Sequence, residues 1–155
     1  MNNSNVIKIG TVVFAGLLLF LNLTAAQADN RDPKPCSVAT LEGGFGYTVT
    51  GALVSGTFAG PFAAAGKLTF DGMGNFENIR TISRNGNILP NEEGSGTYTV
   101  NPDCTGTFTF TEGGVVTLGT DIVIDDNGNE IRMVATSPGT VLTIVGRKQF
   151  PQSGR

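Results

Sequence analysis

The most regular pattern in this chain is an alternation of apolar and polar residues in short runs separated by turn-forming residues. The runs are rich in threonine, valine, isoleucine and phenylalanine, which β-strands favour, and helix-favouring residues are sparse after residue 28. Eight principal runs cover residues 45–54, 62–70, 76–83, 96–100, 105–111, 115–124, 130–136 and 140–148. Ile88 and Leu89 begin a further short run that Pro90 interrupts. The pattern predicts an all-β domain.

The segments between the runs are mostly short and contain the residues that tight turns require. They include Asp71–Asn75, Asn85-Gly86, Asn101–Asp103 and Asn127-Gly128. Short turns make neighbours in the sequence pair antiparallel, and closing the sheet removes its two edges. We therefore expect a single antiparallel eight-stranded up-and-down barrel. A β-sandwich is the alternative; it needs longer connections, for which only residues 56–61 and 84–94 are candidates.

Residues 1–28 have the pattern of a secretory signal peptide. Lys8 precedes an almost wholly apolar stretch from Val12 to Leu21, and Ala26-Gln27-Ala28 supplies the small residues of a cleavage site. The alternative is an uncleaved membrane anchor, for which the apolar stretch is short. We expect an exported protein, periplasmic or secreted. Its organisation would be an N-terminal segment over 29–43 with a short helical turn at 37–42, a barrel domain over 44–149 and a polar tail over 150–155.

Two cysteines, Cys36 and Cys104, remain after the signal peptide. An even number of cysteines in an exported chain predicts a disulfide, which here would be worth roughly 4 kcal/mol on the chain-entropy model. The alternative is a pair of free thiols.

Charge and composition exclude several classes of function. Without Lys8 the net charge is about −4, which argues against nucleic acid and anionic membrane surfaces as partners. The chain has no histidine, so histidine-dependent catalysis and histidine metal sites are excluded. Residues 125–130 resemble a calcium loop only superficially, and the Asn127-Gly128 turn already explains them. We expect no metal and no cofactor.

Candidate binding residues come from the aromatic side chains and from one charged run. Eight strands enclose an interior just wide enough for side chains or one small ligand. The residues that we expect to face such a ligand are Tyr47, Phe62, Phe70, Glu77, Arg80, Tyr98 and Phe110. For the aromatic residues the alternative is a solid core, and for Glu77 and Arg80 it is a solvated outer face.

Three motifs of this chain resemble those of a group of small secreted bacterial proteins. The motifs are the opening Cys36-Ser-Val-Ala-Thr-Leu-Glu-Gly43, the segment at 66–76, and the turn Asn101-Pro-Asp-Cys-Thr-Gly106. The group has no settled function. The pattern is also similar in architecture to the calycin and allene-oxide-cyclase-like eight-stranded barrels. That class includes isomerising cyclases, plant dirigent proteins and binders of apolar ligands, so the resemblance implies a barrel but no one activity.

The function that the sequence favours is binding of a small apolar molecule inside the barrel, because the strands and aromatic residues come without a catalytic constellation. One alternative is an isomerase or cyclase acting on an apolar substrate. Another is a non-catalytic structural or surface-interaction protein with a solid core.

Overall fold

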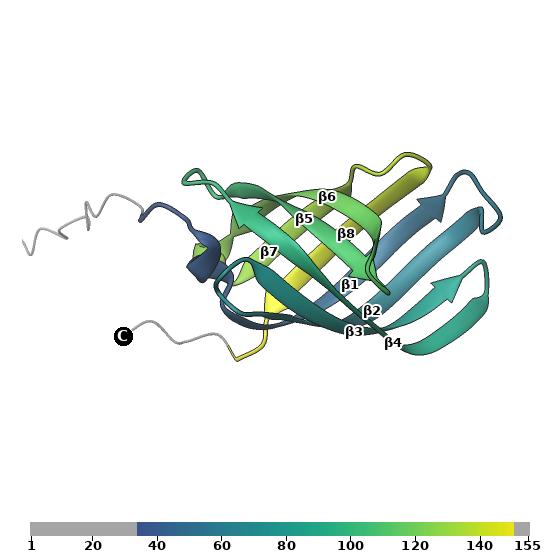
Figure 1. Ribbon diagram of the computed structural model, residues 1–155, viewed down its shortest axis with the longest axis horizontal. Helices are drawn as coiled ribbons and strands as arrows, with labels where there is room; N and C mark the ends of the chain where they lie inside the picture. The colour runs from purple at the N-terminus through teal and green to yellow at the C-terminus, as the bar shows by residue number, and fades with distance from the viewer. Residues whose placement is uncertain (1–33, 151–155) are drawn as a thin grey trace, which may run out of the picture. The chain divides into compact units, whose positions relative to one another are not determined.

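The computed structural model describes residues 34–150, apart from the side chain of Val116, and the signal peptide predicted for residues 1–28 lies outside them. Eight antiparallel strands form one closed barrel in which each strand pairs with its neighbours in the sequence (Figure 1). The strands are β1 (Gly43–Leu53), β2 (Gly60–Phe70), β3 (Asn75–Arg84), β4 (Asn87–Val100), β5 (Thr105–Glu112), β6 (Val115–Asp125), β7 (Glu130–Ala135) and β8 (Thr140–Lys148). The prediction of an eight-stranded up-and-down barrel is confirmed.

Pairing between the first and last strands closes the barrel. β1 pairs with β8 over nine positions, from Phe45 opposite Lys148 to Leu53 opposite Thr140. This ladder leaves neither β1 nor β8 as an edge strand, which excludes the β-sandwich alternative. Side chains alternate between the interior and the solvent along most strands, as in β8, where Leu142 and Ile144 are buried and Val141 and Thr143 are exposed.

The predicted helical turn is a short 3-10 helix, η1 (Val38–Leu41), at one end of the barrel. The Ser37 backbone N–H donates to Thr40 Oγ1 over 3.0 Å, which stabilises the start of the turn. Leu41 is fully buried, and the Val38 carbonyl accepts a hydrogen bond from the Tyr98 hydroxyl over 2.9 Å. η1 therefore closes this end of the interior. No helix within residues 34–150 is long and apolar enough to cross a membrane.

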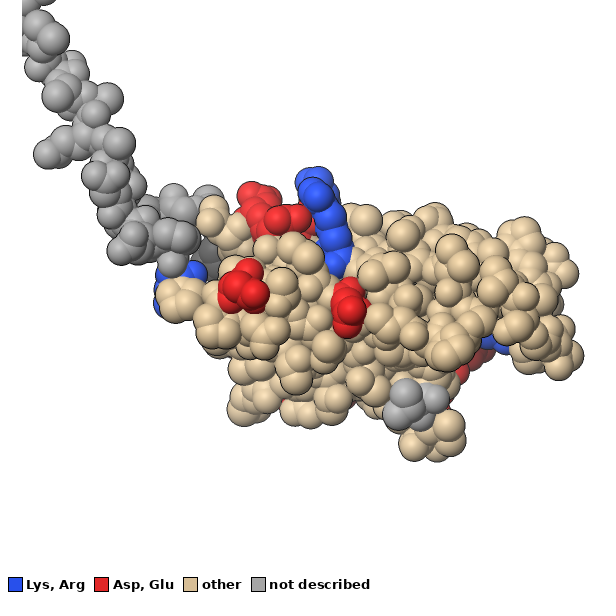
Figure 2. Space-filling view, turned by 90° about the horizontal axis from the view of Figure 1, so that it is seen from above, with Lys and Arg blue, Asp and Glu red and all other residues tan. Residues whose placement is uncertain are grey.

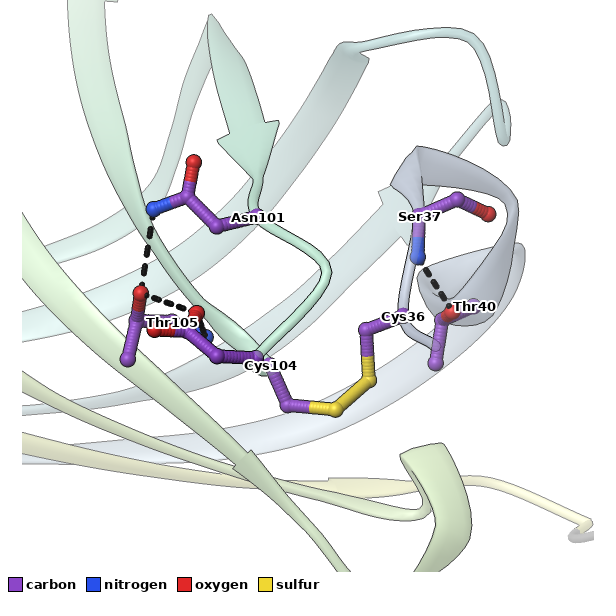
Figure 3. Close-up of a disulfide and its surroundings, with 7 residues drawn as sticks. Cys36, Ser37, Thr40, Asn101, Cys104 and Thr105 are labelled. Atoms are coloured by element: carbon purple, nitrogen blue, oxygen red, sulfur yellow. Dashed lines mark hydrogen bonds between the residues drawn. A yellow bond between two sulfur atoms is a disulfide. The ribbon is translucent and has the colours of Figure 1, made fainter. Parts of the chain in front are cut away.

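A disulfide joins this N-terminal segment to the turn between β4 and β5, as predicted. Cys36 and Cys104 are bonded, with their Cα atoms 5.0 Å apart (Figure 3). The turn around Cys104 is fixed by its own side chains, because Asp103 Oδ1 accepts from the Thr105 backbone N–H and hydroxyl over 3.1 and 2.7 Å. The bridge thus fastens η1 to a turn with a defined conformation.

Strand β4 is longer than the pattern predicts, because it continues through Pro90 from Asn87 to Val100. The register shifts between Arg80 and Ile82 of β3, which face Glu92 and Leu89 of β4, so that Pro90 and Asn91 together oppose Thr81. Asn91 has a positive φ of 56°. A bulge of this kind tolerates proline because it interrupts the ladder of backbone hydrogen bonds. The connection from β3 is consequently a tight Asn85-Gly86 hairpin.

Candidate functional site

The interior of the barrel has two halves of different character. Toward η1, six aromatic rings pack together, with centroids of neighbouring rings 4.9–6.4 Å apart. We call this group the aromatic cluster; it contains Phe45, Phe70, Phe76, Tyr98, Phe108 and Phe110, all of them buried. Rings in these edge-on and tilted arrangements fill space densely, so this half is a solid core.

The other half of the interior contains a cavity of ≈ 290 Å³. It lies toward the β1–β2, β3–β4 and β7–β8 loops, which share one end of the barrel in Figure 1. Phe110 of the aromatic cluster lies at its inner end, and Phe58 of the β1–β2 loop lies at its outer end. Its apolar wall comes from β1, β2, β3, β6 and β8: Val49, Leu53, Phe62, Ala64, Ile82, Leu118, Leu142 and Ile144. We refer to this space as the barrel cavity.

Charged side chains also reach the barrel cavity. Arg80 of β3 forms an ion pair with Glu112 of β5, and its side chain is only 13% exposed. The two residues come from the strands on either side of β4, where Glu92 is the register partner of Arg80 and Gly94 is the register partner of Asn78. A Cβ atom at Gly94 would lie 2.9 Å from Asn78 Oδ1 and 3.5 Å from Glu112 Cγ. The glycine therefore leaves room for polar groups inside the barrel.

Tyr47 brings a buried hydroxyl to the same region from β1. Tyr47 and Arg80 are both register partners of Gly66 on β2, so no side chain stands between them in this row. Burial raises the pKa of Tyr47 above its ordinary value of 10.0, while the nearby Arg80 guanidinium and Asn78 amide lower it by less. The phenol is accordingly neutral at physiological pH and keeps its proton for donation.

Several polar atoms in this region have no hydrogen-bond partner among the described protein groups. They are Tyr47 Oη, both amide atoms of Asn78, Arg80 Nε and Arg84 Nε, all buried. Asn78 and Tyr47 are 6% and 4% exposed. Tyr47, Arg80 and Arg84 line the barrel cavity, whereas Asn78 lies outside its wall. Buried polar groups nearly always have partners, so the exceptions at the cavity mark a place for a polar group of another molecule or of solvent.

Arg84 lies nearer the mouth of the barrel cavity. It is four positions after Arg80 on β3, on the same inward face, and its guanidinium carbon lies 4.6 Å from the centroid of the Phe58 ring. In residues 34–150, Arg84 has no carboxylate within ion-pair distance. Phe58 itself is 58% exposed, so the stacked pair stands between the cavity and the solvent.

The structure distributes the predicted binding residues over three environments. Tyr47, Phe62, Arg80 and Phe110 line the barrel cavity. Phe70 and Tyr98 belong to the aromatic cluster instead, so they form core on the side of η1. Glu77 is exposed on the outer face of β3, because it follows the inward-facing Phe76 by one residue.

Among the residues of the barrel cavity that were not predicted as binding residues are Phe58, Arg84 and Glu112. Arg84 is an even number of residues away from Phe76 and Arg80 along β3. This spacing places it on the same inward face, and it is the sequence signal that could have identified Arg84. Glu112 becomes a partner of Arg80 only through the register of β3, β4 and β5, which includes the bulge at Pro90 and Asn91. No local pattern identifies that contact.

A second hollow of ≈ 570 Å³ lies outside the barrel, beside the disulfide. Its wall consists of the segment around Cys36 and the loop Asp125–Gly128. Within the described chain, this groove has none of the buried, unpartnered polar side-chain atoms that gather at the barrel cavity. The barrel cavity is the stronger candidate for a binding site.

No protein-family model matches the chain, and no significant match is found among curated proteins.

Proposed function

We propose that this protein binds one small, mostly apolar molecule in the barrel cavity. The observation that carries the proposal is the division of the interior into a solid half and a cavity of ≈ 290 Å³ with a largely aliphatic and aromatic wall. Ligand pockets are usually concave, mostly apolar and equipped with a few polar groups, and they start at about 300 Å³. A ligand of modest size therefore matches the space.

The solid half gives the cavity a rigid base. A barrel filled with side chains along its whole length is the interior expected of a purely structural protein, and the aromatic cluster fills only the half next to η1. Transfer of an apolar ligand from water to this wall contributes about 25 cal/mol for each Å² of apolar surface removed from solvent. Little of that free energy is spent on reorganising a wall that is already formed.

The test uses N-phenyl-1-naphthylamine, a neutral fluorescent probe whose emission rises in apolar surroundings. We expect saturable binding with one site per chain. The variant Ala64→Phe places a large side chain in the cavity wall and is expected to weaken binding tenfold or more, by about 1.4 kcal/mol. Ala65→Phe is the matched control, because Ala65 is the next residue of β2 and is exposed on the outer face.

Thermal unfolding of both variants establishes that the barrel is intact, and Ala64→Leu replaces Ala64→Phe if the larger side chain prevents folding. Equal affinity for the probe in folded Ala64 and Ala65 variants would place the probe outside the barrel cavity and overturn the proposal. Absence of saturable binding to the wild-type chain would do the same.

A second candidate function is an isomerase or cyclase of an apolar substrate, and Tyr47 is the observation that favours it. A buried, neutral phenol beside the guanidinium of Arg80 can donate to a substrate oxygen on which negative charge develops. A molecule recovered with the protein from its host would be incubated with wild-type protein and with Tyr47→Phe. Conversion to a product of equal mass but different retention, by the wild type alone, is the expected result for an enzyme. Recovery of the molecule unchanged after incubation with the wild type would contradict the enzyme and support ligand binding alone.

A further inference from the structure

The unpartnered buried atoms at the barrel cavity are mainly hydrogen-bond donors. Arg80 Nε and Arg84 Nε can only donate, and the Tyr47 hydroxyl carries a proton to donate. A wholly apolar ligand would leave these donors without partners, which costs about 1–3 kcal/mol for each group. The ligand that fits this site therefore carries acceptor oxygens at one end.

The charge balance inside the barrel favours an anion. The cavity wall has two guanidinium groups, Arg80 and Arg84, and one carboxylate, Glu112, which is paired with Arg80. Glu92, the register neighbour of Arg80 on β4, is half-buried and is not part of the cavity wall. Arg84 remains as a cation that no carboxylate of the described chain contacts.

The charges on one outer face of the barrel are unevenly distributed along its length (Figure 2). On the face shown in Figure 2, the charged side chains gather toward the end at which η1 lies in Figure 1, and few lie on the half nearer the loops. Arg84 points inward with Phe76, Asn78 and Arg80, and its Nε is buried. Keeping a guanidinium partly out of water is costly unless a partner group compensates it.

We infer that the ligand of the barrel cavity is an amphipathic monoanion, an apolar body that ends in a carboxylate, with Arg84 as the counter-ion and the Tyr47 hydroxyl as a second donor. This inference rests on the proposed binding function. A carboxylate is planar, carries one negative charge and accepts two parallel bonds from a guanidinium. Its single charge balances the one uncompensated cation, whereas a phosphate would bring an excess of negative charge into a partly apolar space.

Two probes that share one apolar body provide the test. N-phenyl-1-naphthylamine is neutral, and 1-anilinonaphthalene-8-sulfonate has the same ring system with an added anionic group. We expect the wild-type chain to bind the anionic probe about tenfold more tightly or better. In competition against either probe, octanoate is expected to displace it at lower concentration than octan-1-ol, and octylamine is expected to be the weakest competitor.

Arg84→Gln removes the proposed counter-ion and keeps a polar side chain. It is expected to abolish the preference for the anionic probe and for octanoate, while the affinities for the neutral probe and octan-1-ol change by less than about threefold. Lys67→Gln is the matched control, since it removes the same charge from an exposed position on the outer face of β2. Tyr47→Phe is expected to weaken octanoate binding and to leave the neutral probe unaffected.

The outcomes distinguish binding in the barrel cavity from recognition of a carboxylate. Saturable binding of both probes with equal affinity, and no advantage of octanoate over octan-1-ol, would overturn the carboxylate while leaving cavity binding in place. An equal loss for neutral and anionic probes in Arg84→Gln would show that Arg84 only packs against the site. If neither probe binds, the proposed function itself fails. An anion preference that survives in Arg84→Gln but disappears in Lys67→Gln would move the site to the outer surface.

Discussion

Replacing the two cysteines by serine provides a quantitative test of how the disulfide stabilises the barrel. Cys36 and Cys104 are 68 positions apart, and a cross-link of this span restricts the unfolded chain by about 4 kcal/mol at 25 °C on the chain-entropy model. A domain of this size unfolds with an entropy of about 2.1 cal/mol/K per residue. The double variant is therefore expected to lose roughly 15 °C in Tm.

Each single variant, Cys36→Ser or Cys104→Ser, breaks the same bond and is expected to be as unstable as the double variant. Calorimetry on the oxidised wild type, the wild type with reductant and the three variants measures the effect. The affinity for N-phenyl-1-naphthylamine below Tm is expected to change by less than about twofold, because the bridge and the barrel cavity lie at opposite ends of the strands.

A decrease in Tm of less than about 5 °C would refute the entropic reasoning, since it would mean that the reduced chain already holds its ends together when unfolded. Loss of probe binding in a folded cysteine variant would contradict the separation of the two halves of the interior.

Four other results are expected. Leu41→Ala, in the fully buried residue of η1, should cost about 2–5 kcal/mol in chemical denaturation. Gly66→Ala should destabilise the barrel strongly, with a large decrease in Tm, because a Cβ there would overlap the Ile79 carbonyl and the Arg80 backbone. Hydrogen bonds lower the pKa of Asp71 in the folded state. The contribution of its carboxylate to stability is therefore present at neutral pH and is lost as pH falls through the folded pKa. Asp71→Asn removes this contribution, so the Tm of the variant should depend less steeply on pH in the acid range. Burial raises the pKa of both Tyr47 and Tyr98, so ultraviolet titration should show the tyrosines of the folded protein ionising at higher pH than free tyrosine. Stability should fall as pH rises above 10, because the unfolded chain then loses its tyrosine protons more readily than the folded chain.

The fold could be predicted because its determinants are local. Alternation with a period of two identifies strands, and Asn-Gly and similar turns make neighbours antiparallel, so that eight strands in sequence order leave little choice of topology. The prediction was wrong at β4, because the pattern predicts an interruption of the strand at Pro90, whereas β4 continues through it from Asn87 to Val100. A bulge depends on the partner strand as well as on its own residues, and a single run of sequence does not contain that information.

The candidate site could be predicted only in part, because the position of a residue along the barrel axis depends on the pairing of all the strands and not on the neighbouring sequence. Phe62 and Phe70 lie on the same inward face of β2, yet Phe62 lines the barrel cavity and Phe70 belongs to the aromatic cluster. Glu77 and Arg80 are an odd number of residues apart on β3, so they lie on opposite faces of the strand. The sequence therefore contains the information that both cannot face the same ligand. The contact of Arg80 with Glu112 could not be predicted, because it spans β4 and depends on the register of three strands, including the bulge at Pro90 and Asn91.

Three glycines in the strands restrict which positions of the barrel can be changed. Gly66, Gly96 and Gly106 lie where a side chain would overlap the carbonyl of a neighbouring strand, so the coiling of the scaffold depends on them. Positions such as Ala64, Leu118 and Leu142 face open space in the other half and have no such constraint. If the barrel cavity binds the proposed ligand, substitutions at these positions would alter its selectivity while the aromatic cluster preserves the architecture, as an engineered sensor of small molecules requires.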